Sequence, residues 1–369
     1  MRKLASIVTI DKVSPIPDAD RLETATMVGK TWKVVVGKGD FKSGDKAVYF
    51  EIDSYLPADD KRYEFLHSRC LRKFTSKKGE ILAEGVRIKT VKLRGVISQG
   101  MLMPIAKFPE ISDVTDDTDL TETLKVKHYD EIEEALRPFS GAKVSAEAYG
   151  PFPTAYIPKT DEERIQNLGE YFEKMKGRFF QVTEKADGMS VTMFYSPTID
   201  AEHPFGVCSR NLRLKPVMSN GTVPLPWQMA NTYFVESNLK RYCELNGDEL
   251  AIQGELVGPG INGNRDKRTE HEWLVFRIFD IRKQMFVNPD YVRYLCQFQF
   301  KLPHVKIIDR GIKVFDEYPT FEKLMDYTQG KTDRGNEREG IVCKTVEAPY
   351  VAPYISFKVV SNKYLLKGE

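Results

Sequence analysis

The sequence predicts an α+β protein with a small β-barrel at its N-terminus and a larger domain of mixed strands and helices. Residues 1 to about 110 alternate short strand-like segments with glycine-containing turns and lack helical spacing. A proline-rich stretch, "PFSGAKVSAEAYGPFPTAYIP", then interrupts the pattern. Beyond it, strand and helix patterns mix to the end of the chain. We therefore expect a barrel over 1–135, a linker over 136–158 and a second domain over 159–369.

The N-terminal strands are short and regularly separated, which makes the OB-fold one candidate for the barrel. The segments are "LASIVTIDKVSPI", "WKVVVGKGD", "DKAVYFEIDSYL", "GVRIKTVKL" and "SQGMLMP". After the linker, "KTDEERIQNLGEYFEKM" begins with Thr160 followed three residues later by Glu163, the spacing of a capping box. This spacing predicts a helix over 159–175.

Composition is ordinary for a globular protein of two domains. The chain has 369 residues, of which 41% are hydrophobic and 29% charged, and its net charge is +2, so a nucleic-acid surface requires clustered cations. Five cysteines stand singly, which predicts neither disulfides nor a zinc site and suits a reducing intracellular compartment. No run of about 18 apolar residues or signal peptide is present. We expect a soluble monomer without a membrane span.

The stretch "EKADGMS" lies between two alternating segments in "RFFQVTEKADGMSVTMFY", which predicts strand, tight turn and strand. In a purely structural interpretation, Asp-Gly makes a hairpin turn, Gly188 adopts positive φ, and Lys185 is solvated. In a functional interpretation, the Lys185 amine attacks the α-phosphate of a nucleotide, and a nearby carboxylate holds a metal. The three fixed residues alone favour the structural interpretation.

Later segments supply the other parts that a nucleotide-transfer site needs, in order along the chain. They are Arg210 and Asn211 for phosphate or hydroxyl contacts, Glu255 for a ribose hydroxyl, Phe279 for stacking on a base, Glu339 for a metal and Lys358 for a phosphate. Each residue alone is equally well explained as a surface charge or core aromatic. Together they favour an active site. We expect Phe276 in the core, and His203 and His271 to be structural or exposed.

These segments resemble the motifs of the superfamily of polynucleotide ligases and mRNA capping enzymes, which form a covalent lysine–nucleotide intermediate. The N-terminal part and "KTDEERIQN" are similar to the family-5 RNA ligases, which place an OB module before the nucleotidyltransferase domain. The resemblance implies a nucleotidyltransferase (ATP-grasp-like ligase) domain of antiparallel sheets with flanking helices. It also implies an ATP-dependent RNA ligase that acts on RNA or on nicked duplexes containing RNA.

The resemblance implies ATP and Mg²⁺ or Mn²⁺ as cofactors, a lysyl-AMP intermediate and an adenylated 5′ end. It assigns catalysis to Lys185, Asp187 and Lys358, nucleotide binding to Glu184, Gly188, Arg210, Asn211, Glu255, Phe279 and Ile341, and the metal to Asp187, Glu255 and Glu339. One position departs from the pattern. Relatives often carry Lys-x-Lys where this chain has Ser356 and Lys358, so we assign the α-phosphate to Lys358 alone.

The segment 61–80 is rich in cations with interleaved aromatics. Its basic residues Arg72, Lys73, Lys77 and Lys78 are candidates for contacts with a phosphate backbone. A mobile, solvated loop explains the same composition equally well. The sequence leaves both interpretations open.

Two other functions compete with ligation. One is an mRNA capping-type guanylyltransferase, but such enzymes resemble one another in a C-terminal OB domain, and this chain ends 11 residues after Lys358. The other is a nucleic-acid-binding OB protein with an inactive transferase domain, against which the full set of acids and lysines argues. Covalent label from ATP, from GTP or from neither separates the three.

Overall fold

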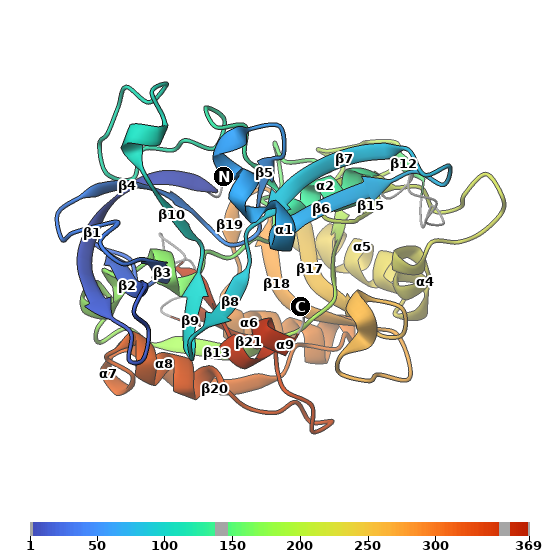
Figure 1. Cartoon of the computed structure of the whole chain (residues 1–369). Helices are drawn as coiled ribbons and strands as arrows, with labels where there is room; N and C mark the ends of the chain where they lie inside the picture. The colour runs from blue at the N-terminus through green and yellow to red at the C-terminus, as the bar shows by residue number, and fades with distance from the viewer. Residues whose placement is uncertain (1–2, 137–146, 347–354, 368–369) are drawn as a thin grey trace. The chain divides into compact units, whose positions relative to one another are not determined.

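The computed structural model describes residues 3–136, 147–346 and 355–367, and it divides the chain into two compact units (Figure 1). Unit 1 comprises Met1–Val144, Gln166–Glu170 and Leu365–Glu369; unit 2 comprises Ser145–Ile165 and Tyr171–Tyr364. All pairings between named strands are antiparallel. None of the described helices is long and apolar enough to cross a membrane.

Unit 1 is built around an OB-like half-barrel of five strands in the order β10-β4-β1-β2-β3. These are β1 (Ala5–Pro15), β2 (Leu22–Met27), β3 (Lys33–Gly37), β4 (Lys46–Phe50) and β10 (Met101–Pro104). The long strand β1 pairs with β4 along its first half and with β2 along its second, with a bulge between Ile10 and Lys12. The bulge lets one strand turn between two partners, which curls the sheet.

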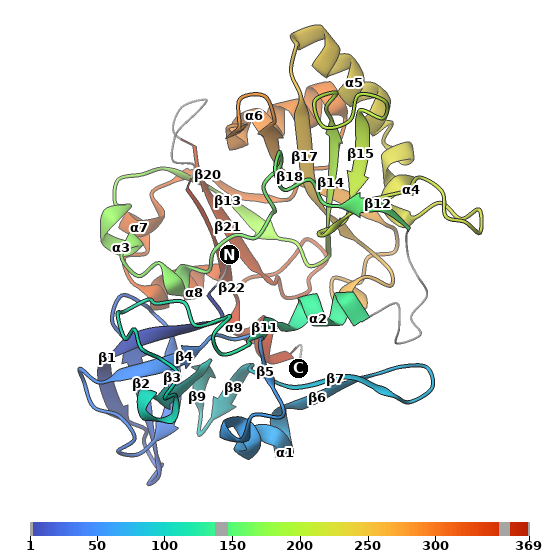
Figure 2. The same cartoon turned by 90° about the horizontal axis from the view of Figure 1, so that it is seen from above.

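A second sheet of unit 1 has the order β11-β5-β7-β6, and β8 pairs with β9 (Figure 2). The strands are β5 (Ser54–Pro57), β6 (Leu71–Thr75), β7 (Ile81–Arg87), β8 (Thr90–Leu93), β9 (Val96–Gln99) and β11 (Lys127–His128); the helices are η1 (Lys61–Leu66), α1 (His67–Cys70), η2 (Ile105–Lys107) and α2 (Tyr129–Leu136). The single strand expected over 45–56 is divided because Asp53 has a φ of 70°. The N-terminal strands therefore form an OB-like half-barrel together with a second sheet and the β8–β9 pair.

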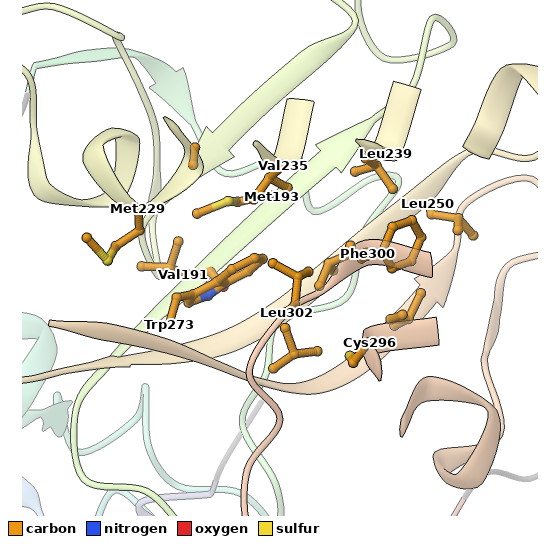
Figure 3. Close-up of a cluster of buried hydrophobic side chains, with 14 of the residues drawn as sticks. Val191, Met193, Met229, Val235, Leu239, Leu250, Trp273, Cys296, Phe300 and Leu302 are labelled. Atoms are coloured by element: carbon orange, nitrogen blue, oxygen red, sulfur yellow. The ribbon is translucent and has the colours of Figure 1, made fainter. Parts of the chain in front are cut away.

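Unit 2 contains a seven-stranded sheet in the order β12-β16-β15-β14-β17-β18-β19. Its strands are β12 (Ala148–Pro151), β14 (Met189–Tyr195), β15 (Phe205–Cys208), β16 (Leu212–Leu214), β17 (Leu250–Val257), β18 (Glu272–Asp280) and β19 (Met285–Phe286). The helical elements α4 (Leu225–Thr232), α5 (Val235–Asn246), α6 (Pro289–Tyr294) and the π-helix η5 (Leu295–Phe300) pack on it. Figure 3 shows the core between them, where Met193 and Trp273 from the sheet meet Leu239 and Phe300.

A four-stranded sheet in the order β20-β13-β21-β22 completes unit 2. Its strands are β13 (Phe180–Lys185), β20 (Ile307–Ile312), β21 (Gly340–Thr345) and β22 (Ser356–Val360). The remaining helices of unit 2 are α3 (Tyr171–Lys174), η4 (Asn262–Asn264), α7 (Val314–Glu317) and α8 (Phe321–Thr328), and the helices η3 (Ile165–Asn167) and α9 (Asn362–Lys367) have residues in both units. Phe180, Phe315 and Phe357 pack together on one face of this sheet, with Phe180 edge-to-face against the other two rings. The two sheets of unit 2 carry the candidate site.

Two sequence-based expectations about the region before β13 are wrong. Strand β12 and the buried Phe152 and Ile157 belong to unit 2, so 148–158 is not a linker; 137–146 lie outside the described residues. The helix expected over 159–175 is absent before Ile165, and Thr160 contacts the Ser190 hydroxyl at 2.9 Å instead of capping a helix. Tertiary contacts therefore override the local capping pattern.

Candidate active site

Lys185 stands where the chain passes from one sheet of unit 2 to the other. It is the last residue of β13, which pairs with β20 and β21, whereas β14 after the turn pairs with β15 and β17. The prediction of two strands around a tight turn is thus confirmed, but the two strands do not form a hairpin with each other. The turn places Lys185 between the sheets.

Gly188 is required by a close approach of two backbones, not by positive φ as the hairpin interpretation supposed. Its φ lies outside the left-handed region. A Cβ at this position would lie 2.3 Å from the carbonyl oxygen of Leu256 and 2.8 Å from Val257 in β17. The absence of a side chain therefore lets the turn after Lys185 pack against the strand that carries Glu255.

We predict that Gly188→Ala slows formation of the lysine–nucleotide adduct by about 100-fold, because a displacement of about 1 Å costs that much in a positioned reaction. The single-turnover rate of adduct formation with labelled ATP measures this. Gly311→Ala in β20 is the matched control, because a Cβ there meets nothing within 4 Å. Equal rates for both variants would show that the turn tolerates displacement.

The Lys185 ammonium forms an ion pair with Glu339, which immediately precedes β21. Nζ lies 2.6 Å from Oε1, and the two side chains are 26% and 14% exposed. Burial disfavours the charge on Lys185, but three neighbouring carboxylates outweigh burial and raise its pKa. These carboxylates are Glu339, Glu255 and Asp187. In the free protein the amine is therefore protonated and not nucleophilic.

Asp187 and Glu255 complete the group of carboxylates. The Tyr364 hydroxyl donates to Asp187 Oδ2, and Asn262 Nδ2 donates to Oδ1 at 3.3 Å. Glu255 is opposite Ser190 in the β14–β17 pairing, and burial, together with the neighbouring carboxylates, raises its pKa to about 8. The structure thus brings the three predicted acids to the predicted lysine.

The same carboxylates fit a divalent cation. Glu339 Oε2 is buried without a hydrogen-bond partner among the described residues. A cavity of about 30 Å³, enough for a water molecule, is lined by Lys185, Asp187 and Glu339. In the described part of the chain, no three acidic, histidine or cysteine side chains are grouped closely enough to hold a metal by themselves. A cation would therefore share its coordination with the oxygens of a nucleotide, as Mg²⁺ commonly does.

Lys358 and Arg210, which the sequence assigned to phosphate, both lie close to one carboxylate, Asp161, that the sequence analysis did not identify. Lys358 Nζ lies 2.8 Å from Asp161 Oδ1, and Arg210 lies 3.5 Å from Asp161 Oδ2. Asn211 Oδ1 accepts from Lys159 Nζ at 2.6 Å. Asp161 therefore stands where a phosphate would be expected to meet both cations.

Asp161 belongs to the segment expected to be helical, and that segment runs alongside β22. Arg164 forms an isolated parallel β-bridge with Lys358, and the backbone amide of Lys358 donates to the Glu163 carbonyl at 2.8 Å. Glu162 pairs with Arg277 at 2.9 Å and accepts from the Ser356 hydroxyl. The signature "KTDEERIQN" thus supplies polar residues to the site, although its capping-like spacing suggested a helix.

The aromatic assigned to the base is a core residue. Phe279 is 4% exposed and packs in a cluster with Phe152, its ring 5.0 Å from that of Phe286. Phe276, expected in the core, is half-buried instead. We correct the assignment on this ground, and Phe276 becomes the candidate for stacking.

Glu184 and Ile341 pair with each other on β13 and β21, one position away from the Lys185–Gly340 pair. Because successive side chains alternate between faces, both lie on the face opposite that of Lys185, although Glu184 at the strand end also lines the cavity beside Lys185. Ile341 is fully buried, and burial raises the pKa of Glu184. At this strand end the backbone of both residues can face a nucleotide, whereas the buried Ile341 side chain cannot.

The sequence of this chain matches the model of a known protein family. The model described as "RNA ligase" matches residues 178–364, which is just over half of the chain. The chain belongs to the RNA ligase family. A second model, described as an "OB-fold domain", matches residues 4–105 of the ligase. The predictions of an RNA ligase and of an OB-fold domain preceding its nucleotidyltransferase domain are confirmed.

Solved structures of Naegleria gruberi RNA ligase are similar to the ligase over its full length. The structure with PPi has 33% identity and a TM-score of 0.82, and the match covers 100% of this chain and 99% of that chain. Single-residue variants with ATP and Mn, and with AMP and Mn, each have 32% identity and a TM-score of 0.81, with 99% of both chains covered. Comparison with curated protein sequences gave no match.

The four candidate RNA-binding cations occupy different places in unit 1. Lys77 and Lys78 are exposed in the turn between β6 and β7. Arg72 and Lys73 are neighbours on β6 and so point to opposite faces, and Lys73 pairs with Glu84 at 2.8 Å. Lys73 is already neutralised, so the cluster is smaller than the sequence suggested.

Proposed function

We propose that the ligase seals 3′-hydroxyl/5′-phosphate breaks in RNA, with nicked duplexes as its substrates, through lysyl-AMP and an adenylated 5′ end. The observation that carries this proposal is Lys185 at a strand end, paired with Glu339 and facing two further carboxylates. A half-buried amine among three acids is an unusual arrangement for stability alone. It suits a nucleophile whose charge must be controlled.

In the first step the Lys185 amine attacks the α-phosphate of ATP, an N–P bond forms, and the bond to pyrophosphate breaks. Lys185 must first lose the proton that its carboxylate neighbours stabilise. Asp187, Glu255 and Glu339 would hold a divalent cation, which supplies positive charge that neutralises the phosphates and favours the unprotonated amine. The protein's own task is positioning and charge neutralisation.

In the second step the 5′-phosphate of RNA displaces Lys185 from AMP, and a phosphoanhydride replaces the N–P bond. In the third, the 3′-hydroxyl attacks that 5′-phosphate and AMP leaves. Asp161 must release Lys358 and Arg210 when phosphate arrives, because one carboxylate occupies both cations in the free protein. Asp161 would thereby keep the two cations aimed at the phosphate site before the nucleotide binds.

The decisive experiment has two parts. The full-length ligase is incubated with α-labelled ATP or GTP, and covalent label is followed; nicked duplexes with RNA or DNA strands are then tested for sealing. We expect label from ATP and sealing of duplexes that contain RNA. Label from GTP would indicate a capping-type enzyme, and no label would indicate an inactive transferase domain.

We also propose that unit 1 binds the RNA backbone through Arg72, Lys77 and Lys78. Replacing these three by glutamine should weaken RNA binding and reduce the slope of log K against log salt by about 2 to 3, because each phosphate contact contributes about 0.7 to 0.9. Lysyl-AMP formation should be unchanged. Lys73→Gln is the control, because Glu84 already pairs with this lysine. An unchanged slope in the triple variant would place the RNA elsewhere.

A further inference from the structure

The loop over residues 258–268, which follows β17, is held in a conformation that few side chains adopt. Asn262, Asn264 and Lys267 in this loop have φ values of 42°, 46° and 55°. A residue other than glycine in the left-handed region costs free energy, and it persists only where its surroundings fix it. Because such conformations cluster at active sites and ligand-binding segments, the loop is a candidate for a functional contact.

Side-chain contacts anchor this loop to the site. Asp266 pairs with Arg268 at 3.1 Å and accepts from the Thr332 hydroxyl at 2.6 Å. Asn262 Nδ2 contacts Asp187 Oδ1 at 3.3 Å. The loop is thus joined to Thr332 and Asp187, which both line the cavity beside the catalytic lysine.

Arg265, in the middle of this loop, presents a guanidinium that pairs with no carboxylate of the described residues. Its neighbours Asn264 and Asp266 line the cavity, whereas Arg265 is exposed and does not line it. The guanidinium lies 4.3 Å from the centre of the Tyr364 ring, and Nη1 lies 3.5 Å from the Tyr364 carbonyl. A guanidinium has five N–H donors, so most of them remain for a ligand.

The Tyr364 ring connects Arg265 to the catalytic group. The hydroxyl of this ring donates to Asp187 Oδ2, and Asp187 is one of the carboxylates beside Lys185. Arg265 and Asp187 are therefore separated by a single tyrosine side chain. An exposed contact between a cation and a ring adds little stability, but it restricts a long side chain that otherwise samples many rotamers. Tyr364 thus holds a charged fork at the edge of the cavity.

We propose, on the basis of the proposed ligation of RNA ends, that Arg265 binds the 5′-phosphate of the RNA strand to be joined. Guanidinium groups match the oxygens of a phosphate with two parallel hydrogen bonds. Lys358 and Arg210 are the cations assigned to the nucleotide, and both lie close to Asp161. Arg265 is exposed outside the cavity, so a polynucleotide end can reach it from solvent. This contact selects a break with a 5′-phosphate over one with a 5′-hydroxyl.

The test compares binding of two nicked RNA duplexes, one with a 5′-phosphate and one with a 5′-hydroxyl at the nick, to full-length ligase without ATP or Mg²⁺. The ratio of the two dissociation constants cancels the contacts with the rest of the backbone. We expect wild type to prefer the phosphorylated nick about 10- to 100-fold, the range for hydrogen bonds to a charged group. Arg265→Gln should reduce the preference to within about threefold. Arg265→Lys should keep part of it, because lysine retains the charge but not the fork.

Lysyl-AMP formation separates this role from a contact with ATP. Its rate and its KM for ATP should stay within about threefold of wild type in Arg265→Gln, because the lost contact is made to RNA only. The melting temperature should be unchanged. Arg241→Gln is the control, because Arg241 is an exposed arginine on α5 of the same unit, and it should match wild type in every measurement.

An Arg265→Gln variant that keeps the wild-type preference for the phosphorylated nick overturns the inference, as does a wild type without that preference. A raised KM for ATP with the preference unchanged would assign the guanidinium to the phosphates of ATP instead. A lowered melting temperature with the preference unchanged would show a structural role only. If Arg265→Gln does not fold, Arg265→Met is measured in the same way. Failure of wild type to form any adduct would instead refute the proposed function.

Discussion

Lys185→Arg is expected to abolish the covalent enzyme–AMP adduct completely, although the variant should remain folded. A guanidinium stays protonated at every accessible pH and cannot attack phosphorus. Arginine can still pair with Glu339, because the Lys185 side chain is 26% exposed and has room at the edge of the cavity. The loss would therefore be chemical and not structural, and Lys185→Met should behave in the same way.

The measurement is retention of label from α-labelled ATP on denatured protein, with the melting temperature as the check on folding. Lys323→Arg in α8 is the control, because Lys323 is exposed and is not among the residues placed in the site. A labelled adduct of normal yield in Lys185→Arg, stable to alkali and labile to acid, would mean that another amine is the nucleophile.

The predicted residues that the structure brings together share one property, which is that each lies at or within two residues of a strand end, next to a glycine or a turn. Lys185, Glu255 and Glu339 are of this kind, and the sheets bring their strand ends together. Short patterns such as Lys-x-Asp-Gly are local. A prediction based on them therefore does not depend on which strands pair with each other. This is why the grouping of these residues could be predicted even though β13 and β14 were assigned to one hairpin.

The residues that were missed depend on partners distant in sequence. Tyr364 and Asn262 both contact Asp187, and Asp161 contacts Lys358, but no spacing pattern links any of them to Lys185. A polar residue of this kind has the same local signature on a solvated surface. Only the tertiary structure tells the two apart.

The incorrect assignment of base stacking to Phe279 has a specific cause. Alternation along "WLVFRIFDI" assumes an unbroken period of two, and on that assumption Phe276 shares a face with Ile278. The bulge at Phe276 inserts one residue and shifts every side chain beyond it to the other face. The hydrophobic pattern does not reveal a one-residue shift of register. This shift is enough to make the sequence-based assignment choose Phe279 in place of Phe276.

Glu339→Gln should slow lysyl-AMP formation by at least about 100-fold at neutral pH, the scale expected when a ligand of a catalytic metal is lost. Two effects of the substitution oppose each other. Losing the Glu339 charge lowers the pKa of Lys185, since Glu339 is the strongest of the carboxylates that hold its proton, and this frees more amine. The same change removes Oε2, the buried oxygen without a partner that suits a cation. We expect the second effect to win because most of the barrier lies in charge on the phosphates.

The pH dependence separates the two effects. Lys185 reacts only without its proton, so the wild-type rate should rise with pH across the whole measured range, which lies below the raised pKa of Lys185. In Glu339→Gln the rate should rise less steeply with pH, because the pKa of Lys185 is lower, and it should stay far below the wild-type rate throughout. Single-turnover rates between about pH 6 and 9 at saturating Mg²⁺ and ATP measure both, with Glu236→Gln on the exposed face of α5 as the control. A variant faster than wild type at neutral pH would mean that Glu339 only restrains the nucleophile, and that Asp187 and Glu255 hold the cation without it.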